Sequence, residues 1–185
     1  TVIIPNPAMP DPNAFDDYLA AGKPLKEDVW IRNVEESQQP EYSMKQRERL
    51  VRQNARALLI LRRGLSHRFR HPPIRSFSTS TSHMAKHRQL ARLLQFESEV
   101  RESQGDLAGA MDSCLDAIEL GVDSQHGATL IGKLVGIACQ GLVTPQAWRL
   151  SNHLTNVQAL RAQRRLQSIT NRHVSFAQSL REEGQ

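Results

Sequence analysis

The chain has 185 residues, of which 39% are hydrophobic and nine are aromatic, and its formal net charge is +5. This length suits one well-buried domain with an additional arm, and the small number of aromatic residues requires a core of Leu, Ile, Val, Ala and Met. No apolar run approaches the ~20 residues of a membrane-spanning helix, and two cysteines are too few for a disulfide framework.

Residues 1–40 are predicted to form an extended arm with one short helix. Asn13 can cap a helix over the sequence AFDDYLAAG, and Gly22, followed by Pro24, ends it. Residues 1–40 carry seven acidic and three basic residues, whereas residues 41–75 carry ten basic and two acidic ones. Either the acidic arm lies against the basic segment, or the basic segment binds an anionic partner.

Residues 41–185 are predicted to form an all-α domain of antiparallel helical hairpins. Apolar stripes with a period near 3.6 residues alternate with segments rich in Pro, Gly, Ser and Thr. The predicted helices cover residues 41–66, 81–103, 107–120, 126–142, 145–153, 156–170 and 172–183.

The predicted helix over residues 126–142 is apolar on nearly all sides, which favours a central position in the fold. Gly132 and Gly136 lie four residues apart and permit close approach of a neighbouring helix. Thr144 and Pro145 form a cap followed by proline at the first helical position, so they predict the start of a separate short helix.

Residues 104–121, with the sequence QGDLAGAMDSCLDAIELG, resemble the turn and second helix of a tetratricopeptide repeat. Gly105 and Asp106 supply the turn, and Ala110 and Ala117 are the small residues at which helices of that family pack. The resemblance covers one hairpin, about residues 90–122, and implies an antiparallel helix pair in a tetratricopeptide-like stack or an irregular bundle.

The same hairpin departs from the family pattern at several positions. Glu97, Ser98 and Arg101 stand where the first helix of the repeat has large, small and aromatic residues, and Cys114 replaces an aromatic residue. No second copy follows at the ~34-residue period, although a repeat stack needs about three copies to bury its faces.

A broader resemblance covers most of the chain. The segments NAFDDYLAAG and AKHRQLARLLQFESEVRESQGDLAGAMDSCLDAIELG, with LIGKLVGIACQ after them, are similar to uncharacterised bacterial proteins that have an N-terminal anchor and an exported helical domain. This resemblance implies an extracytoplasmic or membrane-anchored location, with an anchor upstream of Thr1. It implies no activity and no ligand.

Glu97 is the most informative candidate site residue. It falls near the centre of an apolar stripe formed by Leu90, Leu93, Leu94 and Val100. A buried carboxylate must be paired, hydrogen-bonded or protonated. We therefore expect either a buried pair with an Arg or Lys, or a carboxylate that faces a ligand or acts as an acid or base.

Other polar residues on the same predicted hairpin complete the candidate binding set. Asp112, Asp116 and Glu119 form an acidic strip, which we interpret as a solvated helix face or, alternatively, as a surface for a basic peptide. Arg101 joins Glu97 as a candidate binding residue. We assign no catalytic residues.

Metal and thiol chemistry find little support in the sequence. His83 and His87 are four residues apart, as are His67 and His71, but neither pair has an evident third ligand. Cys114 and Cys139 lie in apolar stripes, where thiols are inert. We therefore expect no metal site and no cofactor.

These features favour a non-enzymatic protein-interaction or structural module whose partner is another protein. The first alternative is an enzyme with an interhelical pocket around Glu97. The second is a basic helical domain that binds nucleic acid, although no nucleic-acid motif supports it. Its candidate residues are Arg62, Arg63, Arg68, Arg70 and Arg75.

Overall fold

The computed structural model describes residues 8–26, 42–72 and 82–183. Within these ranges the chain forms eight helices and no β-strand, which confirms the predicted all-α class. Residues 1–7 and 27–40 of the predicted arm lie outside the described residues. The helices are α1 (Ala14–Gly22), α2 (Met44–Gln53), α3 (Ala55–Leu65), α4 (Ser82–Ser103), α5 (Leu107–Asp123), α6 (Leu130–Ser151), α7 (Asn156–Thr170) and α8 (Phe176–Glu183).

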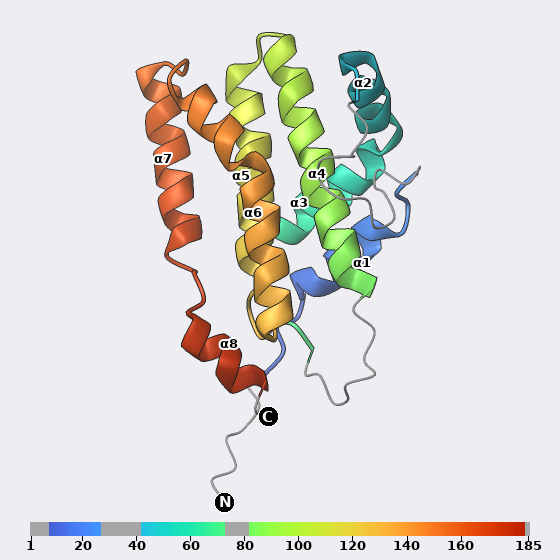
Figure 1. The fold of residues 1–185 in the computed structure, drawn as a ribbon, viewed down its shortest axis with the longest axis vertical. Helices are drawn as coiled ribbons and strands as arrows, with labels where there is room; N and C mark the ends of the chain where they lie inside the picture. Colours follow the sequence, from blue (N-terminus) through green and yellow to red (C-terminus); the bar gives the residue numbers. More distant parts are fainter. Residues whose placement is uncertain (1–7, 27–41, 73–81, 184–185) are drawn as a thin grey trace, which may run out of the picture.

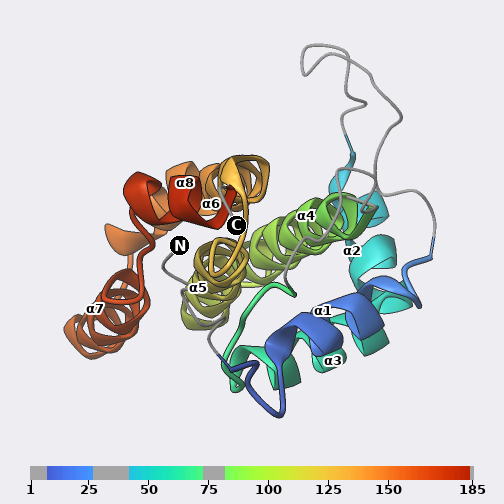
Figure 2. The same ribbon diagram turned by 90° about the horizontal axis from the view of Figure 1, so that it is seen from below.

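Helix α5 lies at the centre of the fold and packs against both α4 and α6, which also pack against each other (Figure 1). Helices α1 and α3 pack together and against α4, while α7 packs against α5 and α8 against α6. Seen from below, α1 and α3 lie on the opposite side of the molecule from α7 and α8 (Figure 2). No helix in the described part of the chain is long and apolar enough to cross a membrane.

The turn between α4 and α5 forms as the sequence predicts. Gly105 has a φ of 81°, a left-handed conformation that favours glycine, and the side chain of Asp106 accepts a 2.9 Å hydrogen bond from the backbone N–H of Gly109. Ala110 and Ala117 are fully buried. The antiparallel pair is therefore present, and its membership of the tetratricopeptide family stays a prediction.

Close contact between α5 and α6 depends on glycine. A Cβ atom added to Gly121 would lie 2.6 Å from the carbonyl oxygen of Gly136, and one added to Gly132 would lie 2.6 Å from the Cβ of Ala128. The expected close helix approach is therefore present at Gly136, which meets the backbone of α5, whereas Gly132 is confined mainly by Ala128 in the segment before α6.

The helix predicted over residues 41–66 is in fact two helices that meet at Asn54. The side chain of Asn54 accepts a 2.7 Å hydrogen bond from the backbone N–H of Lys26 and donates to the carbonyl oxygens of Lys26 and Leu50. Its backbone, at φ −107° and ψ 15°, leaves the helical range. A contact with a residue 28 positions earlier therefore interrupts the helix, and local sequence gave no sign of it.

The second difference lies in α6, which runs without a break through Pro145. The separate helices predicted over residues 126–142 and 145–153 are therefore one helix of 22 residues. Proline removes one helical hydrogen-bond donor, and the carbonyl oxygen that loses this donor belongs to Gly141 on the exposed side of the helix. The continuous helix presents one uninterrupted outward face.

Candidate functional site

A connected set of charged side chains joins α3, α4, α5, α7 and the segment after α7, and we call it the charge ladder. Its carboxylates and arginines alternate, and each carboxylate meets at least two donors. The carboxylates are Glu97, Asp116, Glu119 and Asp123. The arginines are Arg62, Arg101, Arg165 and Arg172.

Glu97 lies at one end of the charge ladder and is 6% exposed. Its carboxylate accepts hydrogen bonds from both terminal nitrogens of Arg62 and, at 2.8 Å, from the hydroxyl of Ser113. Arg101 donates a further bond at 3.2 Å. Burial raises the pKa of Glu97, but the bonds and charges of these donors outweigh it and lower the pKa below its ordinary value.

These contacts decide between the two expectations for Glu97. The residue is a buried carboxylate paired with arginine, ionised and with its acceptor positions occupied. A general acid or base needs free reach to a substrate proton, and Glu97 has none. The geometry therefore gives no support to an interhelical active site around Glu97.

Asp116 and Glu119 connect α5 to α3 and α7. Asp116 accepts from Nε of Arg62 at 2.8 Å and from Arg165 at 2.5 Å. Glu119 accepts from Arg165 at 2.8 Å and also from Arg172. Arg62 of α3 therefore bridges Glu97 and Asp116, and Arg165 of α7 bridges Asp116 and Glu119. These two arginines hold α3 and α7 to α5.

Asp123 ends the charge ladder beneath α1. It accepts hydrogen bonds from the hydroxyl of Tyr18 at 2.7 Å and from Arg172 at 2.9 Å. Burial raises the pKa of Asp123 to about 7, although the bond from Tyr18 and the charge of Arg172 act in the lowering direction. The pKa of Tyr18 is raised, first by burial and then by the Asp123 charge.

The interpretation of the acidic strip as a solvated helix face is wrong. Asp116 is buried, Glu119 is covered by Arg165 and Arg172, and Asp112 is partly exposed but pairs with Arg161 and Arg165. The chain's own arginines occupy the positions that a basic peptide would need. The sequence contains a signal of this pairing. The carboxylates of α5 follow one another at steps of four, three and four residues, and the arginines at 161, 165 and 172 are spaced along a second helical segment so that they can face them.

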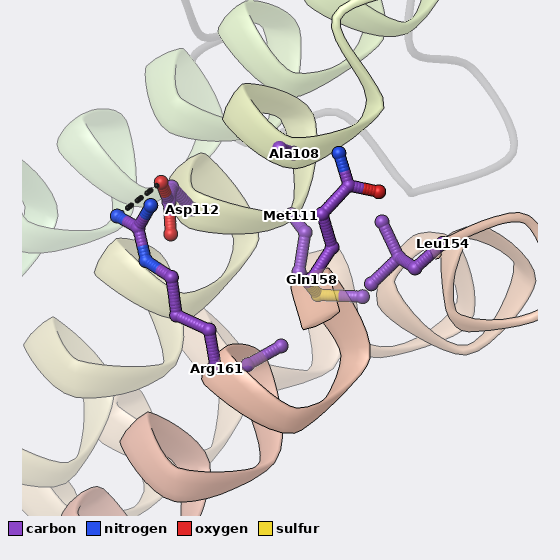
Figure 3. A pocket seen from close by; sticks show the side chains of 7 residues that line it. Ala108, Met111, Asp112, Leu154, Gln158 and Arg161 are labelled. Atoms are coloured by element: carbon purple, nitrogen blue, oxygen red, sulfur yellow. Dashed lines mark hydrogen bonds and ion pairs between the residues drawn. The ribbon is translucent and has the colours of Figure 1, made fainter. Parts of the chain in front are cut away.

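A shallow depression lies at the outer end of this strip, between α5 and α7 (Figure 3). It is open to solvent and has a cavity volume of only about 20 Å³, and Arg161 and Asp112 form a 3.1 Å ion pair at its edge. Ligand pockets are commonly about 300–1,000 Å³ and enclosed, so this depression does not suit a small-molecule substrate. It is lined by Ala108, Met111, Asp112, Leu154, Gln158, Arg161 and Ala162.

The histidines form an internal cluster. Nε2 of His71 and Nε2 of His83 lie 2.7 Å apart, and Nδ1 of His87 contacts the hydroxyl of Ser124 at 3.0 Å. Burial, together with the charges of the other two histidines, lowers the pKa of His87 to about 3. Among the residues that the structure describes, no group of three or more His, Cys, Asp or Glu side chains is arranged to hold a metal ion.

The basic residues proposed for nucleic acid are partly engaged within the chain. Arg62 belongs to the charge ladder, and Arg63 donates to Asp17 of α1 at 2.9 Å. The Asp17 contact also bears out, at one point, the expectation that the acidic arm meets the basic segment. Arg75 lies outside the described residues.

The outward face of α6 is a feature that the sequence interpretation missed. Its exposed residues include a continuous uncharged line that we call the α6 seam. The spacing alternates between three and four residues, as on one face of a coiled-coil helix. The seam consists of Ile131, Leu134, Ala138, Gly141, Pro145 and Trp148.

Two large side chains show how open the α6 seam is. Leu134 is 52% exposed and Trp148 is 77% exposed. The predicted central helix is thus apolar on both sides, with one side buried against α5 and the other uncovered by the described chain. The near-continuous hydrophobicity of this segment is visible in the sequence, but periodicity alone does not separate internal packing from an exposed apolar face.

Comparison with known proteins adds no relative to this picture. No protein-family model matches the chain, and no significant match is found among curated proteins or among solved structures.

Proposed function

We propose that the chain is a non-enzymatic helical interaction module that binds an apolar partner helix along the α6 seam. The observation that carries the proposal is the uncharged outward line of α6, which extends from Ile131 to Trp148. Single exposed apolar side chains are common on proteins, but a continuous line of them over most of a helix is typical of interaction surfaces.

The spacing of the α6 seam supports a helical partner. Positions 131, 134, 138, 141, 145 and 148 alternate steps of three and four, the pattern by which two helices interlock side chains along their length. A flat or irregular partner would not require this period. The small side chains at 138 and 141 leave room for a partner backbone near the middle of the line.

The surroundings of the α6 seam favour protein over lipid. Helices that lie on membranes carry Lys and Arg along the border of their apolar face. In α6, Lys133 is buried and Arg149 is paired with Glu102 at 2.7 Å. The enclosed state of Glu97 likewise makes an enzyme the weaker alternative.

A synthetic amphipathic peptide tests this function. The probe is a labelled helix of about 22 residues, the length of α6, with Leu at coiled-coil contact positions and Glu and Lys elsewhere. We expect micromolar binding by fluorescence anisotropy, and Leu134→Glu should weaken it about tenfold or more, because a charge replaces a buried contact.

Leu59→Glu is the matched control, because Leu59 is 72% exposed on α3, far from α6. This variant should bind the peptide like the unmodified chain. Absence of binding, or equal loss in both variants, would contradict the proposal.

A further inference from the structure

We propose that the partner helix is α6 of a second copy of this chain, paired antiparallel about a twofold axis near Ala138 and Gly141. This inference rests on the proposed function, since it names the occupant of the α6 seam. It depends on four properties of the seam: a glycine with open space above it, an order of side-chain sizes that suits antiparallel pairing, the absence of charge, and the exposed apolar area.

Gly141 makes no close steric contact with the described part of the chain. A Cβ atom added there would meet nothing within 4 Å, and its φ is not positive, whereas Gly132 and Gly136 in the same helix have no room for a Cβ. Glycine in the middle of a helix costs about 1 kcal/mol relative to Ala. The space above Gly141 is therefore open to a partner backbone that approaches from outside.

The order of side-chain sizes along the α6 seam suits self-pairing. Antiparallel alignment places Ala138 opposite Gly141 at the centre, so that the two backbones can approach closely. The same alignment brings Ile131 opposite Trp148 and Leu134 opposite Pro145 toward the ends. A twofold axis makes these contacts twice with one set of residues, as in most homodimers.

Antiparallel pairing is also favoured by electrostatics. The positive end of each α6 dipole would lie beside the negative end of the other. The chain as a whole carries a formal charge of +5, which opposes self-association, but the α6 seam itself contains no charged residue. Pairing along α6 therefore brings no like charges into direct contact.

The exposed apolar area is large enough for a dimer. Helix α8 packs against α6 and adds Phe176 and Leu180, which are both more than half exposed. With Ile131, Leu134 and Trp148 they expose on the order of 600 Å² per chain, which lies at the lower end of the ~600–1,000 Å² that each partner contributes to a standard interface.

Analytical ultracentrifugation of the full chain over about 1–200 μM tests the inference. We expect the mass to rise from 20.9 kDa toward twice that value, with a dissociation constant in the micromolar range. Leu134→Glu should weaken the dimer about tenfold or more, whereas Leu59→Glu should leave it unchanged.

Gly141→Ala separates association from folding. It should stabilise the monomer, because Ala favours the helix, and at the same time weaken the dimer at least several-fold, because the added methyl fills the crossing point. A monomer at every concentration would overturn the inference, and so would a dimer indifferent to Leu134→Glu.

Orientation has its own test. In the antiparallel dimer, Ile131→Cys should form a disulfide only when mixed with Trp148→Cys, and self-linking of Ile131→Cys would overturn the arrangement. The native cysteines should not interfere, since both are buried. If the chain stays monomeric but binds the synthetic peptide through the α6 seam, self-pairing fails and the proposed function stands. If it does neither, both fail.

Discussion

The hydroxyl of Tyr18 donates a 2.7 Å hydrogen bond to Oδ2 of Asp123, across 105 positions of sequence. Tyr18 is fully buried, so the bond lies inside the core. It connects the first helix to the end of α5, where Arg172 holds the other carboxylate oxygen at 2.9 Å. The short N-terminal helix is therefore fixed to the helical body by both packing and a charge-assisted bond.

Tyr18→Phe is expected to destabilise the fold by about 1–3 kcal/mol, because a buried carboxylate loses a donor. The bond lowers the pKa of Asp123, which means that it stabilises the ionised form. The loss should therefore be larger at pH 8, above the Asp123 pKa of about 7, than at pH 5. Urea unfolding at both pH values measures the difference.

The control for this prediction is the same substitution in an Asp123→Asn background. With no titrating group at position 123, the cost of Tyr18→Phe should become nearly independent of pH. An equal cost at pH 5 and pH 8 in the unmodified chain would show that the bond does not distinguish the two forms of Asp123.

Glu97→Ala is expected to cost about 3–5 kcal/mol, because it leaves the half-buried guanidinium of Arg62 without its bidentate partner and Ser113 without an acceptor. The matched control is Asp112→Ala, which removes an exposed pair with Arg161 and should cost less than about 1 kcal/mol. Only the cost of the control substitution should depend strongly on salt concentration, because its ion pair is exposed. Similar costs for the two variants would contradict a structural role for the buried end of the charge ladder.

Much of the fold was predictable because its helices obey local rules. Asn13 caps α1, Asp106 caps α5, and Gly105 makes the turn between α4 and α5. Each of these features depends on residues only a few positions apart. Burial of Glu97 was also predictable from its place in an apolar stripe. These features depend on periodicity and on neighbouring residues, which sequence alone displays.

The remaining features depend on contacts between distant segments. The break at Asn54 comes from its bonds to Lys26, and the covering of Asp116 comes from Arg62 and Arg165, about 50 positions away on either side. Pro145 gave a plausible helix start, yet packing carries α6 through it. A helical pattern cannot say which of two apolar faces is buried, and so the α6 seam was not predicted.

His87→Leu is expected to protect the fold against acid. The pKa of His87 is lowered by burial to about 3, so between pH 6.5 and pH 3 the unfolded chain binds a proton that the folded chain does not. Stability from this group is lost as the pH falls through that range, by about 2–3 kcal/mol between pH 6.5 and pH 4.5. Leucine cannot bind a proton, so His87→Leu removes this loss of stability in acid. The hydroxyl of Ser124, which contacts His87, keeps its hydrogen bond to the carbonyl oxygen of Leu120.

Asp123 changes the stability of the fold with pH in the opposite direction to His87. The contribution of His87 is therefore taken from the difference between His87→Leu and the unmodified chain. A carboxyl group whose folded pKa is raised to about 7 stabilises the fold as the pH falls from 7 toward 4. Subtracting the urea stability of His87→Leu from that of the unmodified chain at each pH cancels this contribution. Exposed His153→Leu is the control, and parallel pH curves for all three proteins would contradict the prediction.

Lys133→Met tests what holds α8 in place. The ammonium group of Lys133 is buried, donates to Gln125 at 3.1 Å and to the carbonyl oxygen of Val174, and lies 4.6 Å from the centre of the Phe176 ring. Burial lowers its pKa, and no described carboxylate pairs with it. Methionine relieves the buried charge at similar volume, so global stability should change by less than about 1 kcal/mol.

The local effect of Lys133→Met should be larger than the global one. Loss of the bond to Val174 releases the segment that leads into α8, whose amide hydrogens should exchange about tenfold faster while those of α5 remain protected. Lys45→Met, at an exposed position of α2, is the control and should leave the exchange of α8 unchanged. Unaltered exchange in α8 would mean that apolar packing on α6, rather than the buried ammonium, keeps the last helix docked.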